Sequence, residues 1–215
     1  MQGQGEIIIF GAGGHGKAVI DLARACGYQV AALVDDGVPA GSAFLGVQVL
    51  GGAACLAELR ERGLSVAANA VGGIGYPAVR QKVFDLLCAA GFSLPTLIHP
   101  RAFVEPSAFI EEGVQVLAMA YVGSDARVGF GSVLNVGAIA SHDVILERVN
   151  NLSPGAALAG GVRLGAYTQV GMNASVNVNI TIGSNCIIGN GATVKQDVPP
   201  DTRVWAGSTW PLRAA

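Results

Sequence analysis

The chain has 215 residues and a formal net charge of −2 at pH 7; 51% of its residues are hydrophobic, 6% aromatic and 13% charged, and 31 are glycine. Charged residues average about 25% and glycine about 7% of a protein, so this chain is rich in aliphatic and small residues. Such a composition hints at a membrane protein, but no run of about 18 apolar residues occurs, which excludes a membrane-spanning helix. The weakly acidic charge argues against a nucleic-acid partner.

The N-terminus and the cysteines favour a cytoplasmic protein. Residues 1–6 contain no basic region in front of an apolar run, so we expect no secretion signal. Cys26, Cys55, Cys88 and Cys186 lie far apart and form no Cys-x-x-Cys pair. Reduced thiols are therefore expected rather than a disulfide framework.

The chain begins with the pattern of a nucleotide-binding βαβ unit. We expect a buried strand over Glu6–Phe10, a helix over Lys17–Cys26 and a second strand over Tyr28–Val34. A G-x-G-x-x-G turn joins the first strand to the helix, and an acidic pair ends the second strand. The glycines would let backbone N–H groups reach a phosphate at the helix N-terminus, and the acidic pair would bind a ribose or a base. A purely structural turn is the alternative reading.

The candidate substrate-binding residues of this segment include a second glycine-rich turn further along the chain. They are Gly13, Gly14, His15, Asp35, Asp36 and Gly73.

The length of this segment limits what it binds. About ninety-five residues precede the repeats described next, and they add a strand over Ser65–Val71 and a helix from about Pro77 to Ala90. A dinucleotide site normally needs two mononucleotide-binding halves. The segment therefore predicts a Rossmann-like βαβαβ half-domain for a nucleoside diphosphate and disfavours a dehydrogenase.

The second half of the chain repeats every six residues. An aliphatic residue recurs from Ile98 to Val194, with Ala140 as the small exception, and glycine often follows it directly. A second register of mostly small residues runs from Ala102 to Val198. Neither a period of 3.6 nor a period of 2 explains this pattern. It predicts a solenoid of short strands with the aliphatic side chains inside, three hexads to a coil, and glycine relieving the tight bend.

These repeats, over about residues 96–205, resemble the hexapeptide-repeat acyltransferases, which implies a left-handed parallel β-helix. The Gly-Ala-Gly-Gly-His-Gly-Lys opening, Asp35-Asp36 and Ser141-His142-Asp143 are similar to the sialic-acid and nucleotide-sugar acetyltransferases of that group. The resemblance implies a nucleotide-sugar-binding domain over residues 1–95 and a β-helix acyltransferase domain over residues 96–215. It also implies acetyl-CoA as co-substrate, no metal, and a homotrimer with active sites between subunits.

His142 and Asp143 are the catalytic candidates. The repeat directs the His142 side chain out of the coil, in the stretch where Ala140, Glu147 and Asn150 break the pattern. Breaks in an otherwise consistent pattern are expected at functional sites. The resemblance implies that His142 removes the proton of the acceptor amine with Asp143 paired to it; a surface histidine packed between subunits is the alternative.

Counted in register from His142, the resemblance assigns one residue to the sugar and four to acetyl-CoA. The sugar contact is Asn135, and the cofactor contacts are Asn151, Gly171, Met172 and Asn190. Close relatives carry a histidine where this chain has Asn151, so that contact departs from the family pattern.

The expected reaction is N-acetylation of a GDP- or UDP-linked 4-amino-deoxy sugar of the kind found in bacterial surface polysaccharides such as O-antigen. O-acetylation of a sialic-acid-type or other surface sugar needs the same scaffold and base and stays open. Metal-dependent hydration on a β-helix needs three histidines, but the repeats hold only His99 and His142. A non-catalytic nucleotide-binding or scaffold protein is the remaining alternative.

Overall fold

The computed structural model of the protein describes residues 5–72, 75 and 77–211. The chain divides into two compact units between Leu97 and Ile98. No helix within the described ranges is both long and apolar enough to cross a membrane.

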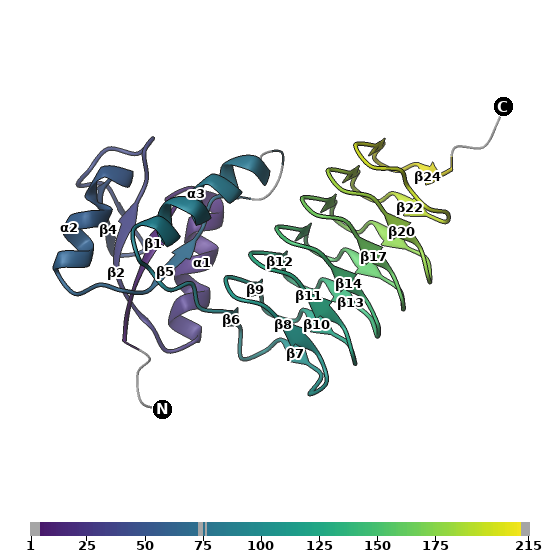
Figure 1. Ribbon diagram of the computed structural model, residues 1–215, viewed down its shortest axis with the longest axis horizontal. Coiled ribbons are helices and arrows are strands. Elements are labelled where there is room, and N and C mark those ends of the chain that lie inside the picture. Colours follow the sequence, from purple (N-terminus) through teal and green to yellow (C-terminus); the bar gives the residue numbers. More distant parts are fainter. Residues whose placement is uncertain (1–4, 73–74, 76, 212–215) are drawn as a thin grey trace. The chain divides into compact units, whose positions relative to one another are not determined.

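The N-terminal unit is a five-stranded sheet with helices (Figure 1). Its elements are β1 (Glu6–Phe10), α1 (Gly14–Ala25), β2 (Gln29–Val34), β3 (Ala43–Phe44), β4 (Val47–Gly51), the 3-10 helix η1 (Ala53–Cys55), α2 (Leu56–Glu61), β5 (Ala67–Asn69) and α3 (Pro77–Ala89). The strand order is β3-β4-β2-β1-β5. The strands β4, β2, β1 and β5 are parallel, and only β3 pairs antiparallel with β4.

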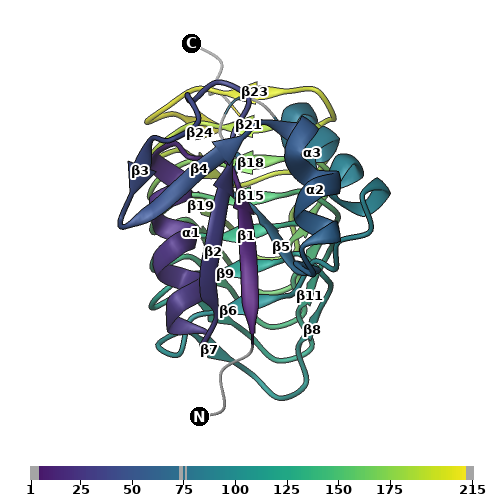
Figure 2. The same ribbon diagram turned by 90° about the vertical axis from the view of Figure 1, so that its left-hand side faces the viewer.

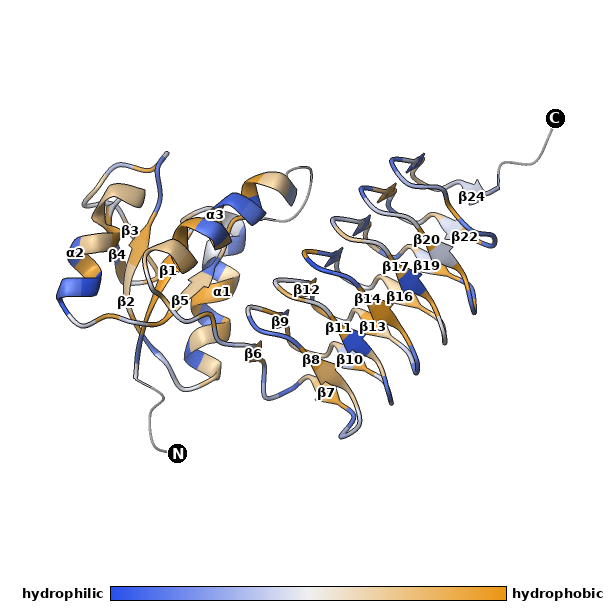
Figure 3. Ribbon diagram, viewed as in Figure 1, coloured by the Kyte–Doolittle hydropathy of each residue, from blue (hydrophilic) through white to orange (hydrophobic). Residues whose placement is uncertain are grey.

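The central strands of this sheet are buried on both faces. Ile7, Ile8 and Ile9 of β1 are fully buried, and Figure 3 colours the middle of the sheet as hydrophobic. Through α1 the chain passes from β1 to β2 on one side of it, and through α2 it passes from β4 to β5 on the other side of β1. Right-handed crossovers therefore place α1 and α2 on opposite faces, as Figure 2 shows. The parallel strands end at one common edge.

The predicted N-terminal elements are present with shifted ends. The first strand has the predicted bounds, but α1 begins at Gly14 instead of Lys17, because the last three residues of the glycine-rich turn already form its first turn. The hairpin β3–β4 and the helix α2 were not predicted. A two-residue strand such as β3 is too short to show a hydrophobic period.

The C-terminal unit is a parallel β-helix of two-residue strands, and its three-sheet form is consistent with the left-handed β-helix that the resemblance implies. The first sheet contains β6 (Leu97–Ile98), β9 (Gln115–Val116), β12 (Val133–Leu134), β15 (Asn151–Leu152), β18 (Gln169–Val170), β21 (Ile187–Ile188) and β23 (Arg203–Val204). The second contains β7 (Phe103–Val104), β10 (Tyr121–Val122), β13 (Ile139–Ala140), β16 (Ala157–Leu158), β19 (Ser175–Val176), β22 (Thr193–Val194) and β24 (Thr209–Trp210). The third contains β8 (Phe109–Ile110), β11 (Arg127–Val128), β14 (Ile145–Leu146), β17 (Arg163–Leu164) and β20 (Thr181–Ile182).

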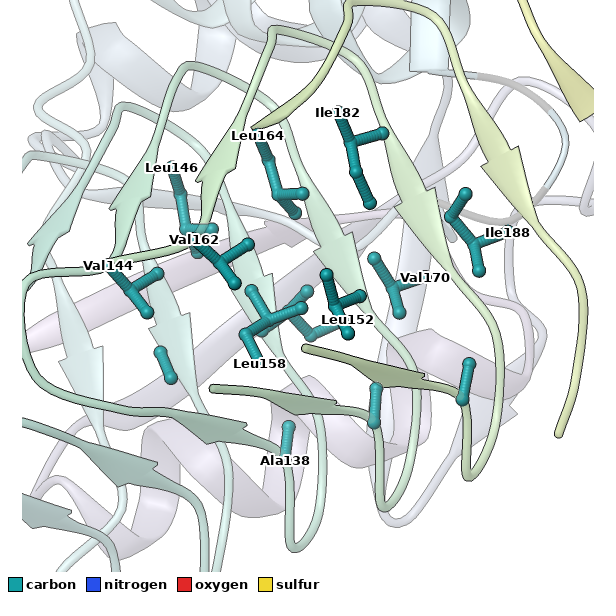
Figure 4. Close-up of a cluster of buried hydrophobic side chains, with 14 of the residues drawn as sticks. Ala138, Val144, Leu146, Leu152, Leu158, Val162, Leu164, Val170, Ile182 and Ile188 are labelled. Carbon is teal, nitrogen blue, oxygen red and sulfur yellow. The ribbon is translucent and has the colours of Figure 1, made fainter. Parts of the chain in front are cut away.

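The predicted aliphatic register fills the interior of this β-helix. Leu134, Leu152 and Val170 pair in adjacent coils, eighteen residues apart, and are fully buried. Figure 4 shows such side chains from all three sheets meeting inside the coils. The narrow interior holds aliphatic side chains in layers, which explains why the chain has few aromatic residues.

Glycine serves two purposes in the coils: it adopts a left-handed φ at the turns, and it allows close contact with the next coil. The sequence interpretation did not distinguish the two. The backbone bends into the left-handed region three residues after the aliphatic position, as at Gly131 (φ 65°) and Asn173 (φ 54°). Glycines directly after the aliphatic position, such as Gly123, have no such φ. A side chain at Gly123 would instead lie 2.6 Å from the backbone nitrogen of His142. Close approach of the next coil therefore requires these glycines, and the prediction that they relieve the bend is wrong.

The last coil is shorter than the others. Val198 was placed in the small-residue register, but it forms a parallel bridge with Ile182, sixteen residues earlier. The pairs Ile188–Val204 and Val194–Trp210 keep the same spacing. The chain drops two residues at the corner after β22, so Val198 takes a strand position instead of a corner position.

Candidate active site

The predicted nucleotide-binding residues gather at the edge where the parallel strands end. Gly13 is the N-cap of α1, and Gly14 and His15 begin the helix. The backbone N–H of Ala12 donates a 2.7 Å hydrogen bond to Asp35 Oδ2, which joins the end of β2 to this turn. Backbone N–H groups and the helix dipole at such an edge favour an anion. Gly73 lies outside the described residues.

The glycines of the turn differ in what requires them. A side chain at Gly11 would lie 2.7 Å from the backbone of Ala70, and one at Gly16 would overlap the carbonyl oxygen of Gly11. Around Gly13 and Gly14 there is nothing within 4 Å of an added Cβ, and Gly13 has an ordinary φ of −78°. Packing explains the first and last glycines, whereas the middle pair leaves open space where a phosphate could approach the backbone.

Both acidic side chains are already engaged by the backbone. Asp35 accepts hydrogen bonds from the N–H groups of Ala12 and Gly37, and Asp36 Oδ1 accepts one from Ala53 at 2.7 Å. Each carboxylate has further lone pairs for a ligand hydroxyl. The structure therefore shows a structural role for the pair that the sequence did not predict.

Arg80 is a residue of this edge that the sequence interpretation missed. Arg80 belongs to α3 and is buried, and its Nη1 donates to the carbonyl oxygens of Asn69 (3.1 Å) and Val71 (2.8 Å). Burial lowers its pKa to about 9, so the group stays protonated at neutral pH. Arg80 thereby ties α3 to the carboxyl end of β5, and no periodic pattern reveals an arginine that points into a core.

In the β-helix unit, His142 and Asp143 form a pair on an exposed corner. They lie in the turn between β13 and β14, and the His142 Nδ1 to Asp143 Oδ2 distance is 2.8 Å. Their side chains are 69% and 63% exposed. With Nδ1 turned to the carboxylate, Nε2 is the nitrogen left to exchange a proton with a ligand.

The other predicted residues of this unit lie at a different corner. Asn135 follows β12, Gly171 and Met172 follow β18, and Asn190 follows β21, all at the corner between the first and second sheets. The Asn190 Oδ1 accepts the Met172 N–H at 2.9 Å, which leaves its amide N–H groups to donate. His142 and Asp143 lie at the corner between the second and third sheets. One chain therefore does not bring the predicted base and these cofactor residues together.

Asn151 lies on neither corner. It begins β15 in the first sheet, between Val133 and Gln169 of the neighbouring coils. Its amide donates to Ser153 Oγ at 3.3 Å.

Within the part of the chain that is described, no three or more His, Cys, Asp or Glu side chains group together in a way that could hold a metal ion. His99 Nδ1 accepts the backbone N–H of Arg101 at 3.0 Å, which gives this histidine a structural contact.

The comparisons with known proteins identify the family of the chain. The PglD N-terminal domain family matches residues 6–87. Perosamine N-acetyltransferase from Caulobacter crescentus, solved as a histidine-to-asparagine variant with CoA and GDP-perosamine, is 39% identical over 95% of each chain, with a TM-score of 0.90. The chain belongs to this acetyltransferase family. It is an acetyl-CoA-dependent acetyltransferase.

A further structure of the Caulobacter enzyme and one other solved member support the assignment. PerB from Caulobacter crescentus, solved with CoA and GDP-perosamine, is 40% identical over 95% of each chain, with a TM-score of 0.88. The acetyltransferase domain of PglB from Neisseria gonorrhoeae, in complex with acetyl coenzyme A, is 33% identical over 94% of this chain and 97% of that one, with a TM-score of 0.85. No curated protein matches the chain in the sequence search.

Proposed function

We propose that the protein transfers the acetyl group of acetyl-CoA to the amino group of a nucleotide-linked 4-amino-deoxy sugar, with His142 as general base. The observation that carries the proposal is the exposed His142–Asp143 pair, with Nδ1 held by the carboxylate and Nε2 available. The GDP-perosamine bound by the relatives makes a GDP-linked aminosugar the first acceptor to test.

The proposed proton transfers use the free Nε2 of this pair. The uncharged amine attacks the thioester carbonyl, the new C–N bond forms, and His142 Nε2 takes the proton that the nitrogen loses. Asp143 stabilises the imidazolium so formed, as a carboxylate does when it orients a catalytic histidine. The C–S bond then breaks, and the imidazolium returns the proton to the departing thiolate.

The nucleotide would bind at the edge formed by Gly13, Gly14 and Asp35. The open space beside the two glycines supports a diphosphate contact there. Asp36, His15 and Gly73 remain proposed substrate contacts, as does Asn135. Asn151, Gly171, Met172 and Asn190 remain proposed contacts for acetyl-CoA.

We also propose that the active enzyme is a homotrimer. The predicted base and the Met172–Asn190 corner are separated within one chain, so a neighbouring chain would complete the site. Exposed apolar side chains lie on both sheets that meet at this corner, two coils before His142, with Phe103 60% and Phe109 57% exposed. Exposed apolar patches of this kind mark interaction surfaces.

The test follows thiol release from acetyl-CoA with GDP- and UDP-linked 4-amino sugars, and mass spectrometry of the product. We expect acetylation of an amino sugar, and His142→Asn to lower kcat by about 10²-fold or more while folding is kept. His99→Asn is the matched control, since an asparagine oxygen there still accepts the Arg101 N–H. Acetylation of a sialic-acid hydroxyl instead would favour the O-acetyltransferase alternative. Unchanged turnover of His142→Asn would reject the general base.

A further inference from the structure

Gly160 lies in the coil that follows His142, at the same position of the same corner. The equivalent positions of the other coils, eighteen residues apart, hold Pro106, Ser124 and Val178. The backbone at this position therefore accepts a side chain. Gly160 also has no left-handed φ, so its own conformation does not require glycine.

The imidazole of His142 occupies the space that a side chain at Gly160 would need. The three heavy atoms nearest to an added Cβ are all in the His142 ring: Cε1 and Nε2 would overlap it, and Nδ1 would lie 3.1 Å away. The imidazole thus lies against Gly160 near its Cε1–Nε2 bond, while Nδ1 faces Asp143.

We infer that Gly160 is a positioning residue for the general base: its missing side chain forms a seat that, together with the Asp143 carboxylate, fixes where His142 Nε2 meets the substrate amine. The inference rests on the proposed role of His142 in catalysis. A side chain at position 160 would push on the catalytic nitrogen itself. Displacing a catalytic group by about 1 Å can cost about 10²-fold in rate.

The experiment is a double-mutant cycle with Gly160→Ala, His142→Ala and the double variant. In the presence of His142, we expect Gly160→Ala to lower kcat at least about 10-fold, with little change in the KM of either substrate. It should also lower the melting temperature and shift the NMR signals of the His142 ring. In the His142→Ala background the obstruction is gone, so Gly160→Ala should leave the melting temperature unchanged.

The outcomes distinguish the positioning role of Gly160 from the general-base role of His142. Equal losses of melting temperature in both backgrounds would show that the fold, not the ring, requires glycine, and would overturn the inference. An unchanged kcat in Gly160→Ala, with His142→Asn inactive, would also overturn it, because the ring would then reach its position without the seat. If His142→Asn is fully active, His142 is not the general base, and the catalytic role of Gly160 is overturned with it. A melting temperature that Gly160→Ala lowers only in the presence of His142 would still show that the imidazole packs on Gly160.

Discussion

Asp143 has two roles at one position of the chain. Its backbone adopts φ 60°, in the turn position that recurs three residues after each inward aliphatic residue. Asn173, Asn179 and Asn185 hold the equivalent positions with φ of 54°, 56° and 59°. Asparagine and aspartate tolerate this conformation better than other side chains. The fold thus explains why Asp143 is a turn residue, and its 2.8 Å contact with His142 is an addition to that role.

Asparagine at position 143 separates the two roles. We expect Asp143→Asn to fold with an unchanged melting temperature, because other coils use asparagine in this turn. Its amide could donate to Nδ1, leaving the proton on Nε2, and it carries no charge to stabilise the imidazolium, so kcat should fall by about 10²-fold or more. Steady-state kinetics and thermal melts check this prediction. A variant with full kcat and an unchanged melt would show that Asp143 serves the turn alone.

The acidic pair of the N-terminal unit shows the limit of residue-level interpretation. The sequence predicted that Asp35 and Asp36 bind a nucleotide; the structure places them directly after β2, beside the glycine-rich turn. It also shows that backbone N–H groups of Ala12, Gly37 and Ala53 use their oxygens. The Gly37 N–H is a local, Asx-turn partner, but Ala12 and Ala53 lie 23 and 17 residues away, and no local pattern predicts them.

At the scale of the element, one inner corner of the β-helix is polar. Ser132, Asn150, Thr168 and Cys186 stack there, eighteen residues apart. The first three each accept a backbone N–H from the next coil: Ser132 Oγ accepts the Asn150 N–H, Asn150 Oδ1 accepts the Thr168 N–H, and Thr168 Oγ1 accepts the Cys186 N–H. Asn150 is one of the breaks in the sequence pattern, and this ladder gives it a structural explanation.

The ladder predicts the stability of Asn150 variants. Asn150→Ala removes the acceptor of the buried Thr168 N–H and should lower the free energy of unfolding by about 1–3 kcal/mol. Asn150→Ser keeps a hydroxyl of the kind found at Ser132 and should lose less. Denaturant unfolding of the two variants, with kcat as a second readout, checks this. Equal losses for alanine and serine would mean that the volume of Asn150 matters and its hydrogen bonds do not.

The elements of the β-helix could be predicted more fully than those of the N-terminal unit. A six-residue period repeated over seventeen positions, from Ile98 to Val194, leaves few alternatives. The short strand β3 and the six-residue helix α2 carry no comparable signal, since each is too short to show a period. The six-residue period also gave a wrong position for Val198, because the corner before it is two residues shorter than the others.

At the scale of the whole molecule, the predicted active-site residues of the β-helix lie at two separate corners of one chain. His142 is 69% exposed, and a flat exposed corner does not shield a reaction from water. A hollow of about 430 Å³ on the third sheet has Arg127 and Glu147 in its lining and does not include His142. In the proposed homotrimer, a second chain would enclose His142 and bring it to the Met172–Asn190 corner.

Subunit mixing tests this arrangement. We expect His142→Asn and Met172→Asp to be nearly inactive as separate homotrimers, the second because a carboxylate would replace an apolar side chain at a proposed acetyl-CoA contact. Co-expressed with different tags and purified as mixed trimers, the two should regain activity at the interfaces that combine the intact His142 with the intact Met172. Light scattering after size-exclusion chromatography gives the mass. Mixed trimers that stay inactive would place both residues of a site in one chain, and a monomeric active enzyme would contradict the trimer.

The sequence by itself determined the β-helix, the glycine-rich turn between β1 and α1, and the His142–Asp143 pair, because each depends on a short repeat or on residues adjacent in the chain. Only the tertiary structure decided which glycines serve bends and which serve close contacts, and that Gly160 makes room for the imidazole. It also decided that Arg80 holds the end of β5. These facts depend on contacts between neighbouring coils or between a helix and a strand. Such contacts are set by the packing of the elements and not by the local order of residues along the chain.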